Sequence, residues 1–287
     1  MLYHLEPFKL KHLHNAECVK YLGEGSFSNV KLYKCKEKNN NYVCDEFFVV
    51  KQLKNKKVSN EKNLRKMLLN EYTIGSLLNH ENIRQTIDID LKVYCIIFEY
   101  VPSINFLQYI THHKPSLLDK IHCFKQILNG VSYMHNIGIA HMDLKLENIM
   151  IDTIKKQVKI IDLGESKVFH DTLHITEIIP KKGIYGSIPY IAPEEFDIEN
   201  EYNPEKVDVW SCGIILHEII YNKLPWLKAC TENNKYNNYI NSLKSNELIN
   251  KILPDKKSQR LFSMMLEPEP SIRVCINDIK IELNNTF

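Results

Sequence analysis

Short runs of alternating hydrophobic and polar residues dominate the first third of the chain. They read CVKYLG, VKLYKCK, EFFVVKQL and VYCIIFEYV, and they are rich in β-branched and aromatic residues. One stretch with a helical period interrupts them near residues 61–79. After residue 102 the helical period takes over, with long stretches near 119–137 and 205–222. The pattern predicts a β-rich region with one main helix, followed by a mostly helical region.

The change of period near residue 102 divides the chain into two parts. After an N-terminal extension over residues 1–16, we expect a small lobe over residues 17–101 and a larger lobe over residues 102–287. The joining segment, EYVPS, is short, and no internal repeat or low-complexity linker interrupts the chain. The sequence therefore predicts an α+β protein with a ligand site in the cleft between two lobes.

Composition narrows the class of protein. The 287 residues are enough for two lobes, and a hydrophobic content of 44% is ordinary for a globular protein. The net charge of +2 is too near neutral to favour a nucleic acid or an anionic membrane as partner. No apolar run approaches a membrane span, and the first residues lack the apolar segment of a signal peptide. Eight cysteines without a C-x-x-C pair favour reduced, buried thiols in a cytoplasmic or nuclear protein.

The stretch LGEGSFSNV, residues 22–30, places two glycines between β-type runs. Gly23 and Gly25 allow the backbone to come close to a phosphate, and the loop can fold over it. A plain hairpin turn is the alternative, because glycine is also common there. The chain has no G-x-x-x-x-G-K-[ST] sequence, which excludes a Walker A loop.

Lys51 interrupts an apolar strand face. Counted in steps of two, it shares that face with Phe47, Val49 and Leu53. An ammonium group on an apolar face needs a partner of opposite charge. The alternative is a lysine at a strand end that reaches solvent.

Glu71 interrupts an apolar helix face in the same way. Counted in helical steps, it falls within a stripe formed by Leu64, Met67, Ile74 and Leu78. A carboxylate in such a stripe is costly unless it is paired, so we expect an ion pair between Glu71 and Lys51. The alternative is a glutamate at the edge of the stripe that reaches solvent.

The stretch HMDLKLEN, residues 141–148, sets two acids, a lysine and an amide close together, and a further acid, Asp162, follows a strand-like run. An acid between a strand end and a glycine is a common setting for a metal ligand, and Asn148 offers a second oxygen of the kind that Mg²⁺ prefers. Asp143 is then free to accept a hydroxyl proton, with Lys145 beside a transferring phosphoryl group. Each residue alone is more often a solvated loop residue, and only the combination favours catalysis.

Together these motifs resemble the signature of the eukaryotic protein kinases. GEGSFSNV corresponds to the glycine-rich loop of the family, and HMDLKLEN to its catalytic loop. DLG corresponds to D-F-G, and residues 192–194 correspond to A-P-E. The match runs from residue 17 to 283, and VDVWSCGIIL is similar to the central buried helix of the family. The resemblance implies a two-lobed kinase fold. The lysine two residues after Asp143 implies the serine/threonine type.

The resemblance also implies a role for each residue. Lys51, held by Glu71, would contact the ATP phosphates, and Asp162 and Asn148 would bind Mg²⁺. Asp143 would act as catalytic base, and Lys145 would offset the charge of the γ-phosphate, so that catalysis is positioning plus electrostatics. The other ATP contacts would come from the glycine-rich loop, the hinge and the residues around the base: Leu22, Gly23, Glu24, Gly25, Ser26, Phe27, Ser28, Val30, Val49, Phe98, Glu99, Val101 and Met150.

The helical lobe carries further expectations. Asn203 followed by a proline is a good helix start, and residues 205–221 are apolar nearly all round, which indicates a buried helix. By resemblance, Asp208 would hold the backbone of the catalytic loop, and Glu194 would pair with Arg273.

The resemblance bears on the substrate as well. Ser187, in GSIPYIAPE, stands where serine/threonine kinases have a threonine. Glu147 and Glu218 match positions that hold basic side chains before the phosphorylated residue, and Asn105 stands where an acid often contacts the ribose or a further basic residue. A protein substrate with a serine or threonine near basic residues is therefore expected.

One departure from the family pattern concerns regulation. Met142 stands where most members have an arginine, which pairs with a phosphate on the activation loop. Possible acceptors in that loop, residues 162–194, are Ser166, Thr172 and Thr176. Because methionine cannot bind a phosphate, we expect activity that does not depend on loop phosphorylation. The alternative is a cation from within the loop, either Lys167 or Lys181.

Two rival classes can be weighed against the motifs. A pseudokinase acting as a binding module would lack Lys51, Asp143 or Asp162, and a small-molecule kinase would lack A-P-E and the helical lobe. The remaining departures remove no group that touches phosphate or metal: Ser28, Val49, Ile104 and Leu163. Within the family, the chain resembles both checkpoint-type kinases and fungal kinases that regulate nutrient and ion transporters.

Overall fold

The computed structural model describes residues 16–24, 28–35, 38–39, 42–43, 47–54, 61–171, 174–244 and 256–287. The chain divides into two compact units, one of residues 1–80 and 84–102, the other of residues 81–83 and 103–287. Residues 81–83 join the second unit because the backbone of Ile160 donates to Asn82 O at 2.8 Å and Ile83 pairs with Ile160 in a β-bridge. The expected glycine-rich-loop residues Gly25, Ser26 and Phe27 lie outside the described residues, as do residues 1–15.

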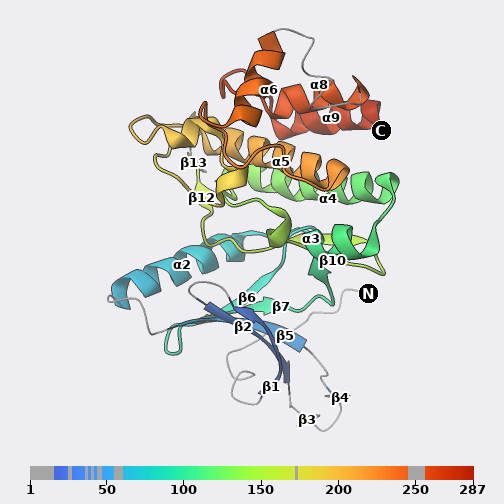
Figure 1. Cartoon of the computed structure of the whole chain (residues 1–287). Coiled ribbons are helices and arrows are strands. Elements are labelled where there is room, and N and C mark those ends of the chain that lie inside the picture. The colour runs from blue at the N-terminus through green and yellow to red at the C-terminus, as the bar shows by residue number, and fades with distance from the viewer. Residues whose placement is uncertain are drawn as a thin grey trace. The chain divides into compact units, whose positions relative to one another are not determined.

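The first unit contains a five-stranded antiparallel sheet in the order β1–β2–β5–β7–β6 (Figure 1). Its strands are β1 (Ala16–Glu24), β2 (Ser28–Cys35), β5 (Phe47–Leu53), β6 (Thr86–Asp90) and β7 (Cys95–Glu99), and a separate short pair is formed by β3 (Lys38–Asn39) and β4 (Tyr42–Val43). The helix α2 (Glu61–Leu77) contributes Leu68 to an apolar cluster on one face of the sheet, with Val49 and Phe98. Phe48, Val50 and Ile97 form the cluster on the other face.

Strand β5 is buried on both faces, which strict alternation did not predict. Val49 lies in the cluster with α2, as predicted, and Leu53 packs against that cluster. Phe47 is 38% exposed, because it begins the strand, whereas Phe48 and Val50 are buried on the opposite face.

The buried stripe of α2 differs from the predicted one by one residue. Glu71, Ile74 and Leu78 are buried as predicted, but Met67 is 45% exposed and Leu68 is buried in its place. Leu68 lies three residues before Glu71, so the helical period accommodates it equally well.

Helices make up most of the second unit. They are α3 (Phe106–Gln108), α4 (Leu117–Asn136), α5 (Pro204–Tyr221), α6 (Asn234–Lys244), α8 (Lys256–Met265) and α9 (Ile276–Thr286), with η1 (Tyr109–His113), η2 (Leu146–Asn148), η3 (Ile188–Tyr190) and η4 (Pro193–Phe196) as shorter turns. A small sheet has the order β11 (Gln157–Ile160), β10 (Ile149–Asp152), β8 (Ile104–Asn105). β9 (Ile139–Ala140) pairs with β12 (Lys167–Val168), and β13 (His170–Asp171) pairs with β14 (His174–Ile178).

The helix α5 runs beside α4 through the core of this unit (Figure 1). The Asn203 side chain caps it by accepting the backbone N–H of Glu205, and every residue from 207 to 219 is buried. The predicted helix start and the predicted burial are both confirmed. No helix within the described ranges is both long and apolar enough to cross a membrane.

The expectation of buried cysteines holds in part. All seven cysteines in the described part of the chain are free thiols, and Cys35, Cys95, Cys123 and Cys212 are buried. Cys18 is exposed because β1 is an edge strand of its sheet.

Candidate active site

The carboxylate of Asp143 is hydrogen-bonded on both oxygens within the second unit. Oδ1 accepts from Ser187 Oγ at 3.0 Å, and Oδ2 accepts from Lys145 Nζ at 2.7 Å and from Asn148 Nδ2 at 3.0 Å. Lys145 Nζ also donates to Ser187 Oγ at 2.7 Å. The structure thus brings the predicted residues Asp143, Lys145 and Asn148 together, and it adds Ser187 to the set. A hydroxyl that donates to Asp143 is the contact a substrate hydroxyl would need.

Asp208 on α5 holds the backbone that leads to Asp143. Its two oxygens accept the backbone N–H groups of His141 and Met142 at 2.7 and 2.9 Å, and Oδ2 also bonds to His135 Nε2 at 2.9 Å. Asp208 is fully buried, so these charge-assisted bonds replace its hydration. The contact predicted for Asp208 is confirmed.

His141 connects the catalytic loop to the residue before Asp162, a contact that no local sequence pattern predicts. Its Nδ1 accepts the backbone N–H of Asp143 at 3.2 Å, and its Nε2 lies 3.0 Å from Ile161 O. One ring proton, on Nε2, satisfies both bonds. The backbone N–H of Ile161 in turn donates to Asn148 O at 2.9 Å. Ile161 is therefore bonded through both its C=O and its N–H. These bonds hold the following residue, Asp162, beside Asn148.

Three left-handed backbone conformations occur at this site. Met142 and Asp162 have φ angles of 67° and 64°, which non-glycine residues rarely adopt. Gly186 has a φ of 80°, and a Cβ there would lie 2.7 Å from Met142 O and 3.0 Å from Asp143 Oδ1. Position 186 therefore requires glycine for the activation segment to approach Asp143. The glycine before Ser187 in the sequence was a signal for this contact.

Asp162 and Asn148 offer oxygen atoms, the kind of ligand that Mg²⁺ prefers. The Asn148 amide nitrogen donates to Asp143 O at 2.9 Å and to Asp143 Oδ2, so only the Oδ1 atom of this amide can act as a metal ligand. No cluster of three or more His, Cys, Asp or Glu residues in the described ranges could hold a metal. Mg²⁺ commonly takes one or two protein oxygens and completes its shell with water and phosphate.

In the first unit, Lys51 and Glu71 form the predicted ion pair. Lys51 Nζ donates to Glu71 Oε1 at 2.9 Å and to Oε2 at 3.0 Å, and the two side chains are 15% and 6% exposed. Lys51 is on β5 and lies opposite Val30 on β2 and Ile96 on β7. A partly buried ammonium is thus compensated by a bidentate carboxylate contact.

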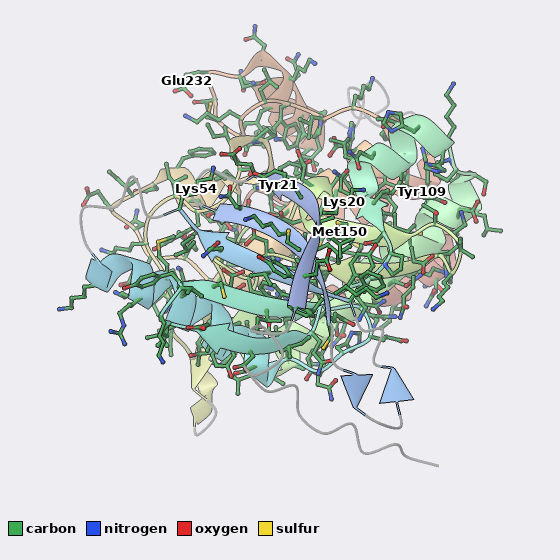
Figure 2. The ribbon with its side chains drawn as sticks, turned by 90° about the horizontal axis from the view of Figure 1, so that it is seen from below. Lys20, Tyr21, Lys54, Tyr109, Met150 and Glu232 are labelled. Atoms are coloured by element: carbon green, nitrogen blue, oxygen red, sulfur yellow. The ribbon has the colours of Figure 1, made fainter. Side chains whose placement is uncertain are left out.

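The strands that flank the glycine-rich stretch form an antiparallel pair. Gly23 on β1 pairs with Val30 on β2, and Leu22 is 41% exposed, whereas Ser28 is 6% exposed. Glu24 forms an ion pair with Lys54, which lowers the pKa of the Glu24 carboxyl. Tyr21 and Lys54, labelled in Figure 2, belong to the same group of polar side chains.

Some of the residues expected around the adenine lie in the first unit and one lies in the second. Phe98 is buried, and the Arg84 guanidinium lies 4.0 Å from the centroid of its ring. Glu99 Oε1 accepts the backbone N–H of Gln85 at 2.7 Å. Val101 follows β7 and is partly buried. Met150 (Figure 2) lies on β10 in the second unit, where it pairs with Asn105.

The acidic residues expected to bind a basic substrate differ in accessibility. Glu147 is exposed, but Glu218 is buried, and its Oε2 accepts a hydrogen bond from Tyr190 Oη at 2.5 Å. Burial raises the pKa of Glu218, and the nearby charge of Glu147 raises it further. Asn105 caps α3 by accepting the backbone N–H of Gln108 at 2.8 Å. Glu147 is therefore the carboxylate that a basic side chain can reach.

One of the acceptors expected in the activation segment, Ser166, is wrong. Ser166 is fully buried and its hydroxyl donates to His141 O at 3.2 Å, so it is not an accessible acceptor. Thr172 lies outside the described residues, and the side chain of Thr176 is not described. Lys167 Nζ lies 4.6 Å from the centroid of the Tyr185 ring, and Met142 is 3% exposed.

The segment ends at Glu194, whose predicted pairing with Arg273 is confirmed by two bonds of 2.6 and 3.0 Å.

Comparison with known proteins agrees with this geometry. The family model described as "Protein kinase domain" matches residues 16–282. The serine/threonine-protein kinase ppk8 of Schizosaccharomyces pombe is 39% identical over 204 residues, which cover 70% of this chain and 37% of that protein. The serine/threonine-protein kinase oca2 of the same yeast is 33% identical over 252 residues, which cover 86% of this chain and 37% of that protein.

A third relative comes from a different yeast. The nitrogen permease reactivator protein of Saccharomyces cerevisiae is 38% identical over 208 residues, which cover 71% of this chain and 25% of that protein. These three relatives are fungal proteins. The aligned residues span at most 37% of the length of these relatives.

Proposed function

Because the chain belongs to the protein kinase domain family, we propose that it transfers the γ-phosphate of ATP to serine and threonine hydroxyls of protein substrates. The observation that carries the proposal is the set of hydrogen bonds from Lys145, Asn148 and Ser187 to the carboxylate of Asp143. A pseudokinase is not favoured, since Lys51, Asp143 and Asp162 are all present and Lys51 is paired with Glu71.

Each catalytic residue would act by positioning or by charge. Asp143 would accept the proton of the substrate hydroxyl, in the place where its Oδ1 now accepts the Ser187 hydroxyl. Lys145 would stabilise the charge on the transferred phosphoryl group. Lys51, oriented by Glu71, would contact the ATP phosphates. Asp162 and Asn148 would hold Mg²⁺, which neutralises phosphate charge when bound.

The remaining ATP contacts are proposed from both units. The first unit would contribute the glycine-rich stretch and residues on β2, β5 and β7: Leu22, Gly23, Glu24, Gly25, Ser26, Phe27, Ser28, Val30, Val49, Phe98, Glu99 and Val101. The second unit would contribute Met150. The apolar cluster that contains Val49 and Phe98, with Val30 packed against it, supports this assignment.

The substrate is proposed to carry basic residues near its serine or threonine, because Glu147 is exposed close to the buried carboxyl of Glu218. Regulation is proposed not to require phosphate on the activation segment. Met142 has no charge, and the segment is already attached to the second unit by the Tyr202 hydroxyl, which donates to Gly183 O at 2.7 Å.

The test is a phosphorylation assay with Mg-ATP and matched peptides that differ only in serine, threonine or tyrosine at one position. Transfer to serine and threonine peptides, found by mass spectrometry and abolished by EDTA, is the expected result. Nucleotide binding without any transfer would instead support the pseudokinase, and transfer only to tyrosine would refute the assigned substrate type. Replacing the flanking arginines of the peptide by alanine tests the role of Glu147.

A further inference from the structure

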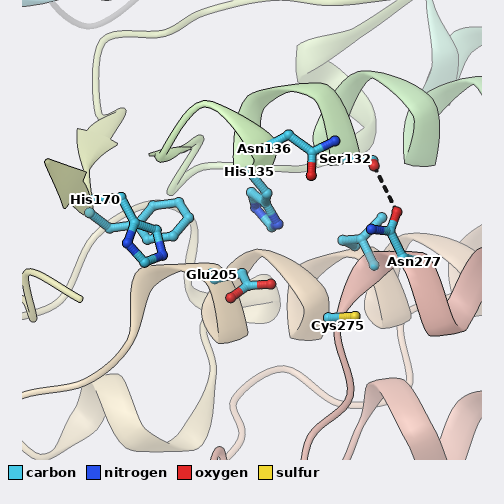
Figure 3. Close-up of a pocket in the computed structure, with 9 residues that line it drawn as sticks. Ser132, His135, Asn136, His170, Glu205, Cys275 and Asn277 are labelled. Atoms are coloured by element: carbon cyan, nitrogen blue, oxygen red, sulfur yellow. Dashed lines mark hydrogen bonds between the residues drawn. The ribbon is translucent and has the colours of Figure 1, made fainter. Parts of the chain in front are cut away.

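A cavity of about 130 Å³ lies in the second unit, apart from the Asp143 set (Figure 3). Its walls come from the end of α4, the start of α5, the start of α9 and the segment that joins β12 to β13. Nine residues line it, among them His135, Asn136, Phe169, His170, Glu205 and Asn277. Since one water takes up about 30 Å³ in the liquid, the cavity has room for a small organic group.

The charge on the cavity wall is negative. Glu205, half-buried in the first turn of α5, forms no ion pair with any residue of the described ranges, and none of the nine lining residues is lysine or arginine. Two basic residues that adjoin the lining residues in the sequence have other partners: Lys206 Nζ donates to Arg273 O at 2.6 Å, and Arg273 pairs with Glu194. An anion is therefore disfavoured here, and a cation would gain a counter-ion.

Histidine and phenylalanine rings form one side of the cavity. The His135 side chain is 6% exposed, and its Nδ1 is buried without a hydrogen-bond partner within the described structure. The ring of Phe169 lies 5.8 Å from that of His135 and 4.7 Å from that of His170. The face of a phenylalanine ring attracts cations, and a flat guanidinium stacks well on aromatic rings. Figure 3 shows His135 reaching from α4 towards the side of α5 that carries Glu205.

The rim carries hydrogen-bonding groups that suit the same ligand. Asn136 and Asn277 are exposed, and Asn277 Oδ1 accepts a bond from Ser132 at 3.0 Å, which joins α9 to α4. Asn136 is also the last residue of α4, and the C-terminal end of a helix favours a cation. The start of α9 is occupied by its own cap, since Asp278 Oδ2 accepts the backbone N–H of Cys275 at 3.3 Å.

We propose that this cavity binds a guanidinium or ammonium group, with Glu205 as its counter-ion and the rings of His135, Phe169 and His170 beside it. The group belongs either to an arginine or lysine side chain of a protein partner or to a free small amine. Such a ligand touches His135, which bonds to Asp208, and Asp208 holds the backbone N–H groups of His141 and Met142. The site is thus connected by direct contacts to the catalytic loop.

Binding is tested by NMR titration of the full chain, with the imidazole signals of His135 and His170 as reporters. The probes are agmatine, a free amine, and N-acetyl-arginine amide, which mimics an arginine within a peptide. N-acetyl-citrulline amide is the neutral control of the same shape. We expect saturable shifts of both histidines with at least one cationic probe and none with the citrulline compound. Binding of agmatine alone assigns the site to free amines, and binding of the arginine amide assigns it to a partner side chain.

Glu205→Gln is expected to weaken binding by about tenfold or more, whereas Glu201→Gln, at an exposed position four residues away, should change it less than about twofold. Asn136→Trp, at the rim, is a second variant that should block access without removing a charge. Equal binding of arginine and citrulline compounds, unchanged binding in both cavity variants, or no saturable shift by any probe would each overturn the proposal. These readouts do not require phosphoryl transfer, so they are separate from the proposed kinase function.

Discussion

The two units hold their charged residues in different ways. In the first unit, Lys51 and Glu71 meet through side chains on β5 and α2, and the position of Glu71 depends on the apolar packing of Leu68 and Ile74 on the same helix. In the second unit, Asp143 is fixed by side-chain bonds to both oxygens and by a backbone that Asp208 and His141 hold. The first arrangement changes when one helix shifts, whereas the second requires several bonds to break. We infer that the ion pair is the adjustable part of the proposed catalytic machinery and that the Asp143 set is the fixed part.

The largest expected effect concerns the fixed part. Asp143→Asn should lower kcat by about 1,000-fold or more, because the amide cannot accept the substrate proton, while ATP affinity stays within about threefold. Steady-state kinetics and a fluorescent nucleotide titration measure the two quantities. Asp197→Asn, at an exposed position, is the matched control and should leave kcat unchanged. Turnover like that of the wild type would remove Asp143 from the mechanism.

The next effect concerns the adjustable part. Glu71→Ala leaves the ammonium of Lys51 without its carboxylate in a position only 15% exposed, so kcat/KM for ATP should fall by about 100-fold. Tyr72→Phe, on the neighbouring residue of α2, should change it by less than about threefold. A crystal structure of a fully active ATP complex with Lys51 and Glu71 apart would show that the pair has no catalytic role.

A third test uses pH to probe the second unit without touching catalytic residues. Glu195 is fully buried, its Oε1 accepts the backbone N–H of Ala192 at 3.0 Å, and burial raises its pKa to about 8 from 4.5. The folded state keeps this proton up to pH 8, but the unfolded state loses it above pH 4.5. The contribution of Glu195 to stability is therefore complete below pH 4.5 and is lost as the pH rises to 8.

Glu195→Gln keeps the acceptor but cannot ionise. Between pH 5 and pH 8.5, its free energy of unfolding relative to the wild type should rise by on the order of 4 kcal/mol, measured by urea unfolding. Burial lowers the pKa of His217 to about 4, so the stability that this residue contributes is lost as the pH falls. This loss is the same in both proteins and cancels when they are compared. A difference independent of pH would show that Glu195 is ionised in the folded protein.

The smallest expected effect concerns phosphate on the activation segment. Enzyme stripped by a phosphatase, with the loss confirmed by mass spectrometry, should keep kcat/KM within about tenfold of its initial value, since tenfold corresponds to about 1.4 kcal/mol. Initial rates must be measured before autophosphorylation recovers. A larger fall would mean that Lys167 or Lys181 binds a phosphate and that the segment is also adjustable.

Local periodicity predicted those parts of the site that depend on one element. It gave the burial of Glu71 and of α5, because a charge within an apolar stripe and a helix that is apolar all round are visible in a short window. It could not choose between Met67 and Leu68, since both fit the helical period and only packing against the sheet decides.

Contacts between residues far apart in the sequence could not be predicted from any short stretch of it. Glu218 accepts a hydrogen bond from Tyr190, and the Ser166 hydroxyl donates to the backbone of His141. In both cases the partner is far away in the sequence. The cavity beside His135 is more distant still, because its walls come from four separate segments between residues 132 and 277. The contacts of Asp208 and Arg273 were anticipated only through the family resemblance.

The conformation of Met142 restricts which residues that position can accept during evolution or design. Its left-handed backbone favours glycine, which would relieve about 1–2 kcal/mol, but its side chain is 3% exposed, and removing a buried side chain of this size costs about 2–5 kcal/mol. A β-branched residue would fill the space but fit the backbone badly. The tolerated substitutions should therefore be few, long and unbranched at Cβ, and a saturation library at codon 142, ranked by soluble expression, should retain leucine while it loses glycine, valine and isoleucine.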